Sequence, residues 1–358
     1  MMARPRRSGR NAGLVVAVTG AAAQIGTAVC RRLVAADSVR QVVALDTQKS
    51  GLPGVTYRRA DPADPTLAGA LHGVDVLVHL ALSVDPDVDR AEQRQRNIRG
   101  AQVALTAAAA TGVKQVLLLS SARVYGAYAD NPVPLPEDAE LRAQPEASAL
   151  GDLLEIERLA RRAERAYPQL DVAVLRPALL VGPGLDHAAS GLLDGPRLLA
   201  VRGARPHWQF CHVDDLASAI EVSVARGLTG AVTVASEGWL EQADVEKALG
   251  RRRVELPAAV AFGTAARLHA IGVTTGPAEL SYLVHPWVVG AEKLRAAGWR
   301  AAYSNAEALA AYAEGRPVVP QRLRINAKGA TAAAGATVAL VGTAALVRRA
   351  RKRRKARG

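Results

Sequence analysis

The stretch "VTGAAAQIG", residues 18–26, places Gly20, Ala23 and Gly26 between a β-branched run and an amphipathic run of helical length. In such a turn the backbone N–H groups at the start of a helix can approach a pyrophosphate, since glycine has no Cβ to block it. At the middle position the Cβ of Ala23 should push the phosphates slightly outward. The pattern predicts a strand, a phosphate-binding turn and a helix, although strand-to-helix turns that bind nothing can share it.

The predicted strand 41–46 ends at Asp46, twenty positions after Gly26. A carboxylate there can accept both ribose hydroxyls of an adenosine and would repel a 2′-phosphate, which favours NAD over NADP. Taken alone, an aspartate at a strand end is more often a cap or turn residue. Together with the glycine turn, it indicates a dinucleotide site that takes NAD.

Short β-branched segments alternate with amphipathic segments of helical length from residue 13 to about residue 180. Strands are predicted at 14–20, 41–46, 55–61, 75–81, 115–121 and 171–177, and helices at about 24–36, 87–110 and 148–167. A parallel sheet that is covered on both faces requires such near-continuous apolar strands alternating with helices. The fold class is therefore α/β, with a doubly wound parallel sheet.

After "VGPG" (181–184) the alternation loosens and predicts a smaller, mostly helical C-terminal substrate lobe. Its helices are predicted at about 190–200, 214–226, 242–249, 257–271 and 305–314. The chain is divided into a basic disordered arm (1–12), a NAD-binding domain (13–180), a substrate-binding lobe interleaved with it (181–318), and an Ala-rich helix with a basic tail (319–358).

The two cysteines, Cys30 and Cys211, belong to no CxxC motif and have no neighbouring histidine pair. Neither a zinc site nor a disulfide framework is therefore predicted, and we expect no bound metal. With 358 residues, 49% of them hydrophobic, the chain is long enough to bury a sizeable core. A reducing, cytoplasmic setting is expected.

The formal charge of +13 is concentrated at the two ends of the sequence. Residues 1–10 contain four arginines and residues 348–358 contain eight lysines or arginines, with no acidic residue in either segment. Subtracting these twelve charges from +13 leaves +1 for everything between. We expect no specific nucleic-acid site, and interpret the tail as a solvated arm that could also be attracted to an anionic membrane surface.

Residues 329–347, "GATAAAGATVALVGTAALV", contain no charged residue. As a helix they would extend about 28 Å, just enough to cross the core of a bilayer, although Ala, Gly and Thr make them only mildly hydrophobic. The basic tail should stay cytoplasmic, yet so should a domain that needs cytoplasmic cofactor, and a single span cannot satisfy both. A membrane-associated helix and a soluble Ala-rich helix both stay open.

Further motifs follow in order along the chain: "TGAAAQIG" (19–26), "ADPAD" (60–64), "VLVHLA" (76–81), "NIRGAQ" (97–102), "SSARVYG" (120–126), "LRPALLVGPG" (175–184), "QFCHVDDLASAI" (209–220) and "KLRAAGWRAAYSNAEAL" (293–309). Over about residues 13–315 the chain resembles the extended short-chain dehydrogenase/reductase family. This family contains the NAD-dependent sugar-nucleotide epimerases and dehydratases and their 3β-hydroxysteroid dehydrogenase relatives. The "HVDD" run is the most specific element, because it is rare by chance.

The resemblance implies a Rossmann-like domain with bound NAD, a small-molecule substrate and a homodimer formed through two helices of the sheet domain. The cofactor-binding residues that it implies are Gly20, Ala23, Gln24, Ile25, Gly26, Asp46, Asp61, Leu80, Ala81 and Asn97. Asp61 would contact the adenine. Ser121 matches the catalytic serine, which hydrogen-bonds the substrate oxygen.

The tyrosine and lysine that accompany this serine in the family are missing. The tyrosine moves a proton, and a lysine four residues later lowers the pKa of its phenol, which at about 10 is too high for a base at neutral pH. Aligning "LEIERL" with the family's helix puts Ala149 or Leu150 at the tyrosine and Leu153 or Leu154 at the lysine. None of the seven tyrosines in the chain is followed by a lysine at the fourth position.

Other residues are weaker candidates for the missing role. Tyr125 and Arg123 flank Ser121, and an arginine can lower the pKa of a phenol. Asp152, which we expect to be an exposed residue of the first helical turn, could act as an acid or base, although such residues more often interact with the helix dipole. The histidines nearest the expected cleft are His187, His207 and His212.

Two functions stay open. The first is a NAD-binding protein of the NAD-dependent epimerase/dehydratase type that lacks the Tyr/Lys pair and works atypically or without the usual hydride transfer. The second is an active, membrane-associated oxidoreductase or epimerase on a nucleotide sugar or a lipid-like, 3β-hydroxysteroid-type substrate. Both share one fold and differ in the chemistry of the site.

Overall fold

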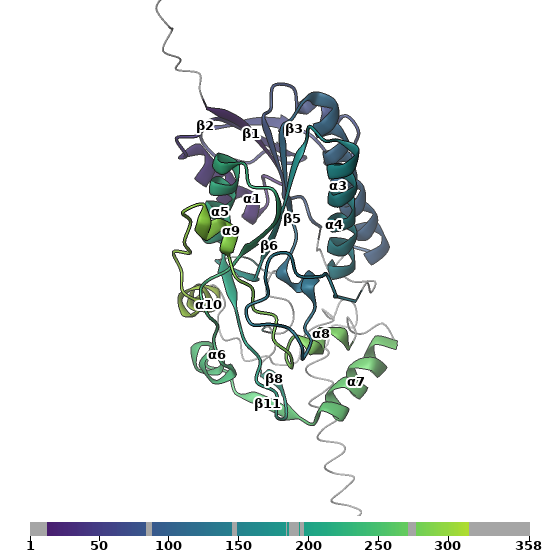
Figure 1. Ribbon diagram of the computed structural model, residues 1–358, viewed down its shortest axis with the longest axis vertical. Helices are drawn as coiled ribbons and strands as arrows, with labels where there is room; N and C mark the ends of the chain where they lie inside the picture. Colours follow the sequence, from purple (N-terminus) through teal and green to yellow (C-terminus); the bar gives the residue numbers. More distant parts are fainter. Residues whose placement is uncertain are drawn as a thin grey trace, which may run out of the picture.

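A computed structural model describes residues 13–83, 88–144, 149–183, 185, 193, 197–270 and 277–314. Its centre is a seven-stranded parallel sheet with the strand order β10-β6-β5-β4-β1-β2-β3 (Figure 1). The strands are β1 (Leu14–Thr19), β2 (Val39–Asp46), β3 (Val55–Arg59), β4 (Val76–His79), β5 (Gln115–Leu119), β6 (Asp171–Pro177) and β10 (Gly230–Val234). The order reverses between β1 and β4, where sheets of this kind bind ligands beyond the carboxyl ends of the strands.

Helices cover both faces of the sheet (Figure 1). One face carries α1 (Gln24–Val34) and α5 (Val213–Arg226), and the other carries α2 (Leu67–Ala70), α3 (Arg90–Thr111) and α4 (Ala149–Ala166). Successive side chains of a strand point to opposite faces, and those of β1 enter two separate cores. Val16 and Val18 pack in one core, and Val15 and Ala17 pack in the other. The predicted doubly wound parallel sheet is confirmed.

The remaining elements lie mostly in the lower half of Figure 1 and form the C-terminal lobe. They are β7 (Leu179–Val181), β8 (Leu198–Val201), β9 (Phe210–His212), β11 (Arg253–Leu256), α6 (Gln242–Leu249), α7 (Ala258–Ala270), α8 (Ala278–Ser281), α9 (Glu292–Ala296) and α10 (Asn305–Glu314). The prediction of a helix at 190–200 is wrong for its last three residues. Residues 198–200 belong to β8, because this short apolar run pairs with β11.

The chain leaves the central sheet after β6 and later returns to it as a further strand. After α5 the chain re-enters the sheet as β10 beside β6, so segments on both sides of residue 180 share one sheet. The exact domain division stays a prediction. Within the described ranges no helix is long and apolar enough to cross a membrane. The predicted basic arm (1–12) and the Ala-rich helix and tail (319–358) lie outside those ranges.

Candidate functional site

The glycine turn between β1 and α1 leaves no room for larger residues. Gly20 has a φ of +68°, and a Cβ there would lie 3.1 Å from the Cα of Ala81, in the segment after β4. A Cβ on Gly26 would lie 2.0 Å from the carbonyl oxygen of Gly20, a distance that real Cβ atoms do not show. Close backbone approach therefore requires glycine at both positions.

Backbone donors gather at the first turn of α1. The N–H groups of Gln24, Ile25 and Gly26 have no acceptor among the described residues, and Ala23 at the N-cap offers no side-chain oxygen. A helix N-terminus with free N–H groups is suited to an anionic group such as a pyrophosphate. The Gln24 side chain extends toward the segment after β7, where its Nε2 donates to the carbonyl oxygen of Pro183 at 2.7 Å.

Asp46, at the end of β2, faces this turn. Its Oδ2 accepts from the N–H of Ala22 at 3.0 Å, and its Oδ1 accepts from the N–H of Gln48 at 3.1 Å. Asp61 follows the neighbouring strand β3, and its Oδ1 accepts from the N–H of Ala63 at 2.9 Å. The residues predicted to contact the ribose and the adenine thus follow adjacent strands at the carboxyl edge of the sheet.

Asn97 on α3 holds the segment after β4 that carries Leu80 and Ala81. Its Oδ1 accepts from the N–H of Ser83 at 2.7 Å. Its Nδ2 donates to the Ser83 carbonyl oxygen and to the carboxylate of Asp152, both at 3.0 Å. Both ends of the amide are therefore engaged, so Asn97 positions this segment; a direct contact of Asn97 with a cofactor stays a prediction.

His79, at the end of β4, is buried beside the glycine turn. Its Nδ1 lies 2.9 Å from the Oγ1 of Thr19, and its Nε2 has no partner among the described residues. Burial lowers the pKa of His79 to about 4, because the interior disfavours the charged ring. The ring is consequently neutral at pH 7.

Acidification is expected to destabilise the protein through His79. In the unfolded chain a histidine has a pKa of about 6.5, so protons bind the unfolded state more tightly and stability falls as the pH drops from about 6.5 to about 4. Urea unfolding at pH 7 and pH 4.5 should show a loss of about 2 to 3 kcal/mol from this group. In His79→Asn, which keeps a polar side chain without the titration, that share of the loss should disappear. An unchanged pH dependence in this variant would contradict the assignment.

Ser121 follows β5 and caps the short 3₁₀ helix η1 (Ala122–Tyr125), where its Oγ accepts from the N–H of Arg123 at 3.3 Å. Tyr125 is buried: its hydroxyl donates to the carbonyl oxygen of Glu137 and accepts from Nη1 of Arg176, both at 2.8 Å. Burial raises the pKa of Tyr125. The suggestion that Arg123 activates this phenol is therefore wrong.

The first turns of α4 carry the four positions that align with the family's missing tyrosine and lysine. In either alignment their side chains are aliphatic. Ala149 is exposed and Leu153 is half-buried, whereas Leu150 and Leu154 are buried in the core. None of these four side chains can donate or accept a proton.

Asp152 is buried, not exposed as the sequence predicts. Only 1% of its side chain is accessible, and its Oδ1 forms ion pairs with Nη2 of Arg90 at 2.6 Å and Nη1 of Arg94 at 3.0 Å. Both arginines belong to α3, so this carboxylate joins α3 to α4. Sequence spacing gives no signal for the cluster, because its members are far apart along the chain.

Two of the candidate histidines pack against aromatic rings of the lobe. His212 caps α5, where its Nδ1 accepts from the N–H of Asp214 at 3.2 Å, and its ring stacks on Tyr303 with the centroids 3.7 Å apart. His207 packs on Trp239 with the centroids 4.6 Å apart. These contacts indicate structural roles. His187 lies outside the described residues.

A buried ion pair beside Ser121 is not visible in the sequence. Arg176 on β6 donates from Nε and Nη2 to the two carboxylate oxygens of Glu157 on α4, at 2.8 and 2.7 Å. Ser120 donates its hydroxyl to the same carboxylate at 2.8 Å. Only 6% of the Arg176 side chain and 2% of the Glu157 side chain are accessible. This pair fixes α4 against β6, and the Ser120 hydroxyl links it to the end of β5.

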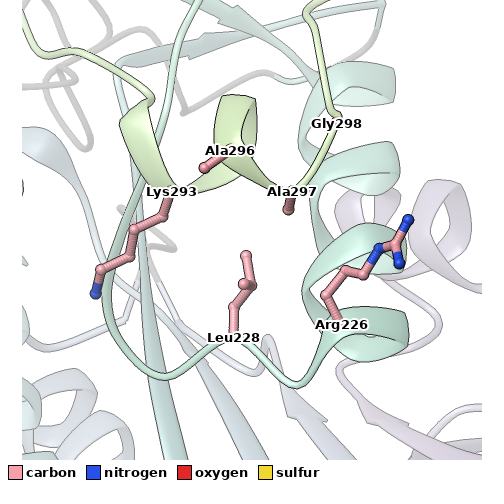
Figure 2. Close-up of a pocket in the computed structure, with 6 residues that line it drawn as sticks. All are labelled: Arg226, Leu228, Lys293, Ala296, Ala297 and Gly298. Atoms are coloured by element: carbon pink, nitrogen blue, oxygen red, sulfur yellow. The ribbon is translucent and has the colours of Figure 1, made fainter.

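Two hollows lie away from the glycine turn. One, of about 660 Å³, lies between the end of α5 and α9, and Figure 2 shows its lining. Leu228, Ala296 and Ala297 point into it, while the charged ends of Arg226 and Lys293 turn aside. The other, of about 290 Å³, is lined partly by Trp239 and Trp299 of the lobe. Neither hollow is lined by a residue predicted to bind the cofactor.

Comparisons with known proteins agree with this geometry. The model of the NAD dependent epimerase/dehydratase family matches residues 16–234. An uncharacterized protein of Mycobacterium tuberculosis is 27% identical over 319 residues, which cover 86% of this chain and 85% of that protein. An uncharacterized protein of Sinorhizobium fredii is 27% identical over 212 residues, which cover 56% of this chain and 51% of that protein.

Solved structures share the fold. A UDP-glucose 4-epimerase of Thermotoga maritima, solved with UDP-glucose, is 20% identical with a TM-score of 0.62, covering 84% of this chain and 98% of its own. The dTDP-glucose 4,6-dehydratase DesIV of Streptomyces venezuelae, solved with NAD bound, is 23% identical with a TM-score of 0.63, covering 84% of this chain and 96% of its own. At these identities the likeness concerns the fold alone.

Proposed function

Because the chain belongs to the NAD-dependent epimerase/dehydratase family, we propose that it binds NAD at the glycine turn and lacks the family's usual Tyr/Lys route of proton transfer. The proposal rests on one observation: the N–H groups at the start of α1, free among the described residues, come directly after the turn whose Ala22 N–H donates to the carboxylate of Asp46. Donors for a pyrophosphate and an acceptor for ribose hydroxyls then lie side by side, as a dinucleotide requires.

The residues of the turn fit NAD by shape as well as by chemistry. Gly20 and Gly26 bring the backbone close enough for the first turn of α1 to reach a phosphate. The N–H groups of Gln24, Ile25 and Gly26 would hold the pyrophosphate. The Asp46 carboxylate would accept the ribose hydroxyls and repel a 2′-phosphate, so the site favours NAD over NADP.

The reactive end is where this chain departs from its family. Bound NAD supplies a hydride acceptor, and the protein must orient the substrate and take the proton from its hydroxyl. Ser121 can hydrogen-bond the substrate oxygen, but Ala149, Leu150, Leu153 and Leu154 offer no base at the expected place. Among the described residues, these four positions offer the hydroxyl proton no acceptor, so we expect that the usual oxidation is not promoted.

Calorimetry on the full chain tests this function. We expect heat on adding NAD and an affinity for NADP about tenfold weaker or more, because the 2′-phosphate would face the Asp46 carboxylate. Asp46→Asn should narrow this difference, since it removes the negative charge and keeps an acceptor. A panel of alcohols and nucleotide sugars should give neither NADH absorbance nor an epimer. Absence of heat with both dinucleotides would disprove the binding site, and formation of NADH would disprove the loss of proton transfer.

A further inference from the structure

Arg123 is a cation two residues beyond Ser121, at the predicted reactive end of the site. It lies in η1, directly after β5, and its side chain extends to α8 of the C-terminal lobe. The Arg123 side chain is only 14% accessible. A guanidinium group withdrawn from water needs contacts that compensate for its lost hydration. Any N–H group of Arg123 that these contacts leave unused is available to a ligand.

Two residues of α8 and its end hold Arg123. Nη2 of Arg123 forms an ion pair with Oε2 of Glu279. The guanidinium carbon lies 4.4 Å from the centroid of the Tyr282 ring, and the Tyr282 hydroxyl donates to the Arg123 carbonyl oxygen at 2.6 Å. The ring and the hydroxyl therefore fix the guanidinium and its backbone independently of the ion pair.

The ion pair leaves part of the guanidinium without a partner. Its Nε is buried and has no hydrogen-bond partner among the described residues, although a buried donor of this kind is normally satisfied. Arginine binds carboxylates through two parallel N–H groups, whereas the contact with Glu279 uses Nη2 alone. Glu279 is thus an incomplete partner, and its side chain, 19% accessible, has a route to water.

We propose that Arg123 binds a carboxylate on the part of the ligand that lies against Ser121, and that this carboxylate takes the place of Glu279. The ligand class is an alcohol that bears a carboxylate, such as a sugar acid. This inference rests on the proposed function, because Ser121 and the bound NAD define the reactive end. Tyr282 keeps the guanidinium in place during the exchange, so a second carboxylate meets a group that is already oriented. A neutral ligand gains nothing from Arg123 and leaves the pair with Glu279 intact.

The test compares binding of D-glucuronate, D-glucose and inorganic phosphate to the full chain, with and without saturating NAD, by NMR titration. We expect D-glucuronate to bind at least about tenfold more tightly than D-glucose. Arg123→Met should weaken D-glucuronate about 10- to 100-fold, as expected for loss of a charge-assisted contact. Glu279→Gln should strengthen it several-fold, because the competing charge is removed.

A matched control comes from Arg142, which also pairs with an acid, Asp130, and lies 4.2 Å from the ring centroid of a tyrosine, Tyr128. Arg142→Met should leave D-glucuronate binding unchanged. Circular dichroism confirms folding of every variant, and calorimetry of the same variants reports NAD binding separately, so that failure of the NAD site is recognised independently of Arg123.

Three results would overturn the inference. One is equal binding of D-glucuronate and D-glucose to the wild-type chain. Another is that Arg123→Met and Glu279→Gln weaken D-glucuronate binding equally, which would mean that the ion pair only holds η1 against α8. The third is that phosphate binds in an Arg123-dependent manner while D-glucuronate does not bind, which would exclude a carboxylate as the group that Arg123 recognises.

Discussion

Replacement of Gly26 by alanine is expected to abolish NAD binding. The added Cβ would lie 2.0 Å from the carbonyl oxygen of Gly20 and 2.7 Å from the Cα of Ala21, and both neighbours are backbone atoms that cannot rotate away. The turn must open to relieve this overlap, which moves the first N–H groups of α1 away from the pyrophosphate. Overpacking of this kind costs about 1 to 3 kcal/mol of stability, so Gly26→Ala should also unfold at lower urea concentration.

Gly69 provides the matched control, because it also lies inside a helix, α2, and a Cβ there meets no atom within 4 Å. Gly69→Ala should bind NAD like the wild-type chain and be as stable or slightly more stable, since alanine favours helix by about 1 kcal/mol over glycine. Calorimetry and urea unfolding of the two variants give both comparisons. Normal NAD affinity in a folded Gly26→Ala variant would contradict the proposed site.

Replacement of Arg176 by methionine is expected to cost about 3 to 5 kcal/mol of unfolding free energy. The change leaves the buried carboxylate of Glu157 without its bidentate partner, while the hydroxyl of Tyr125 and the carbonyl oxygen of Glu137 each lose a donor. An unpaired charge with 2% accessibility cannot be hydrated. Urea unfolding followed by circular dichroism measures the loss.

Two further variants separate burial from charge. Arg158→Met breaks the exposed ion pair with Glu155, in which the Arg158 side chain is 54% accessible and the Glu155 side chain 22%. This change should alter the free energy of unfolding by less than about 1 kcal/mol. Arg176→Met combined with Glu157→Leu removes both buried charges and should regain a large part of the loss, since two apolar side chains need no partner. A double variant no more stable than Arg176→Met alone would show that the cost comes from packing and not from the isolated carboxylate.

The sequence predicted six of the seven strands of the sheet and the turn at which we propose a dinucleotide binds. Strand and helix periodicity is local, so β1 to β6 and the three long helices α1, α3 and α4 were predicted close to their observed bounds, whereas the four-residue α2 was not predicted. The glycine turn and Asp46 were also predictable, because a parallel sheet brings the carboxyl ends of its strands to one edge. The short strand β8 was mistaken for helix, because four apolar residues carry no clear period and its pairing with β11 depends on a distant segment.

Only the tertiary structure decided what surrounds Ser121. Asp152 is buried because two arginines of α3 meet it, and Tyr125 is withdrawn from chemistry because Arg176 and Glu137 occupy its hydroxyl. Arg123 meets Glu279 across 156 positions of the chain. Local propensity extends over a few residues, whereas burial and charge pairing depend on which distant segments pack together. The sequence could therefore predict the turn at which we propose that a dinucleotide binds, and the packing of α3, α4 and α8 determined the partners of Asp152 and Arg123.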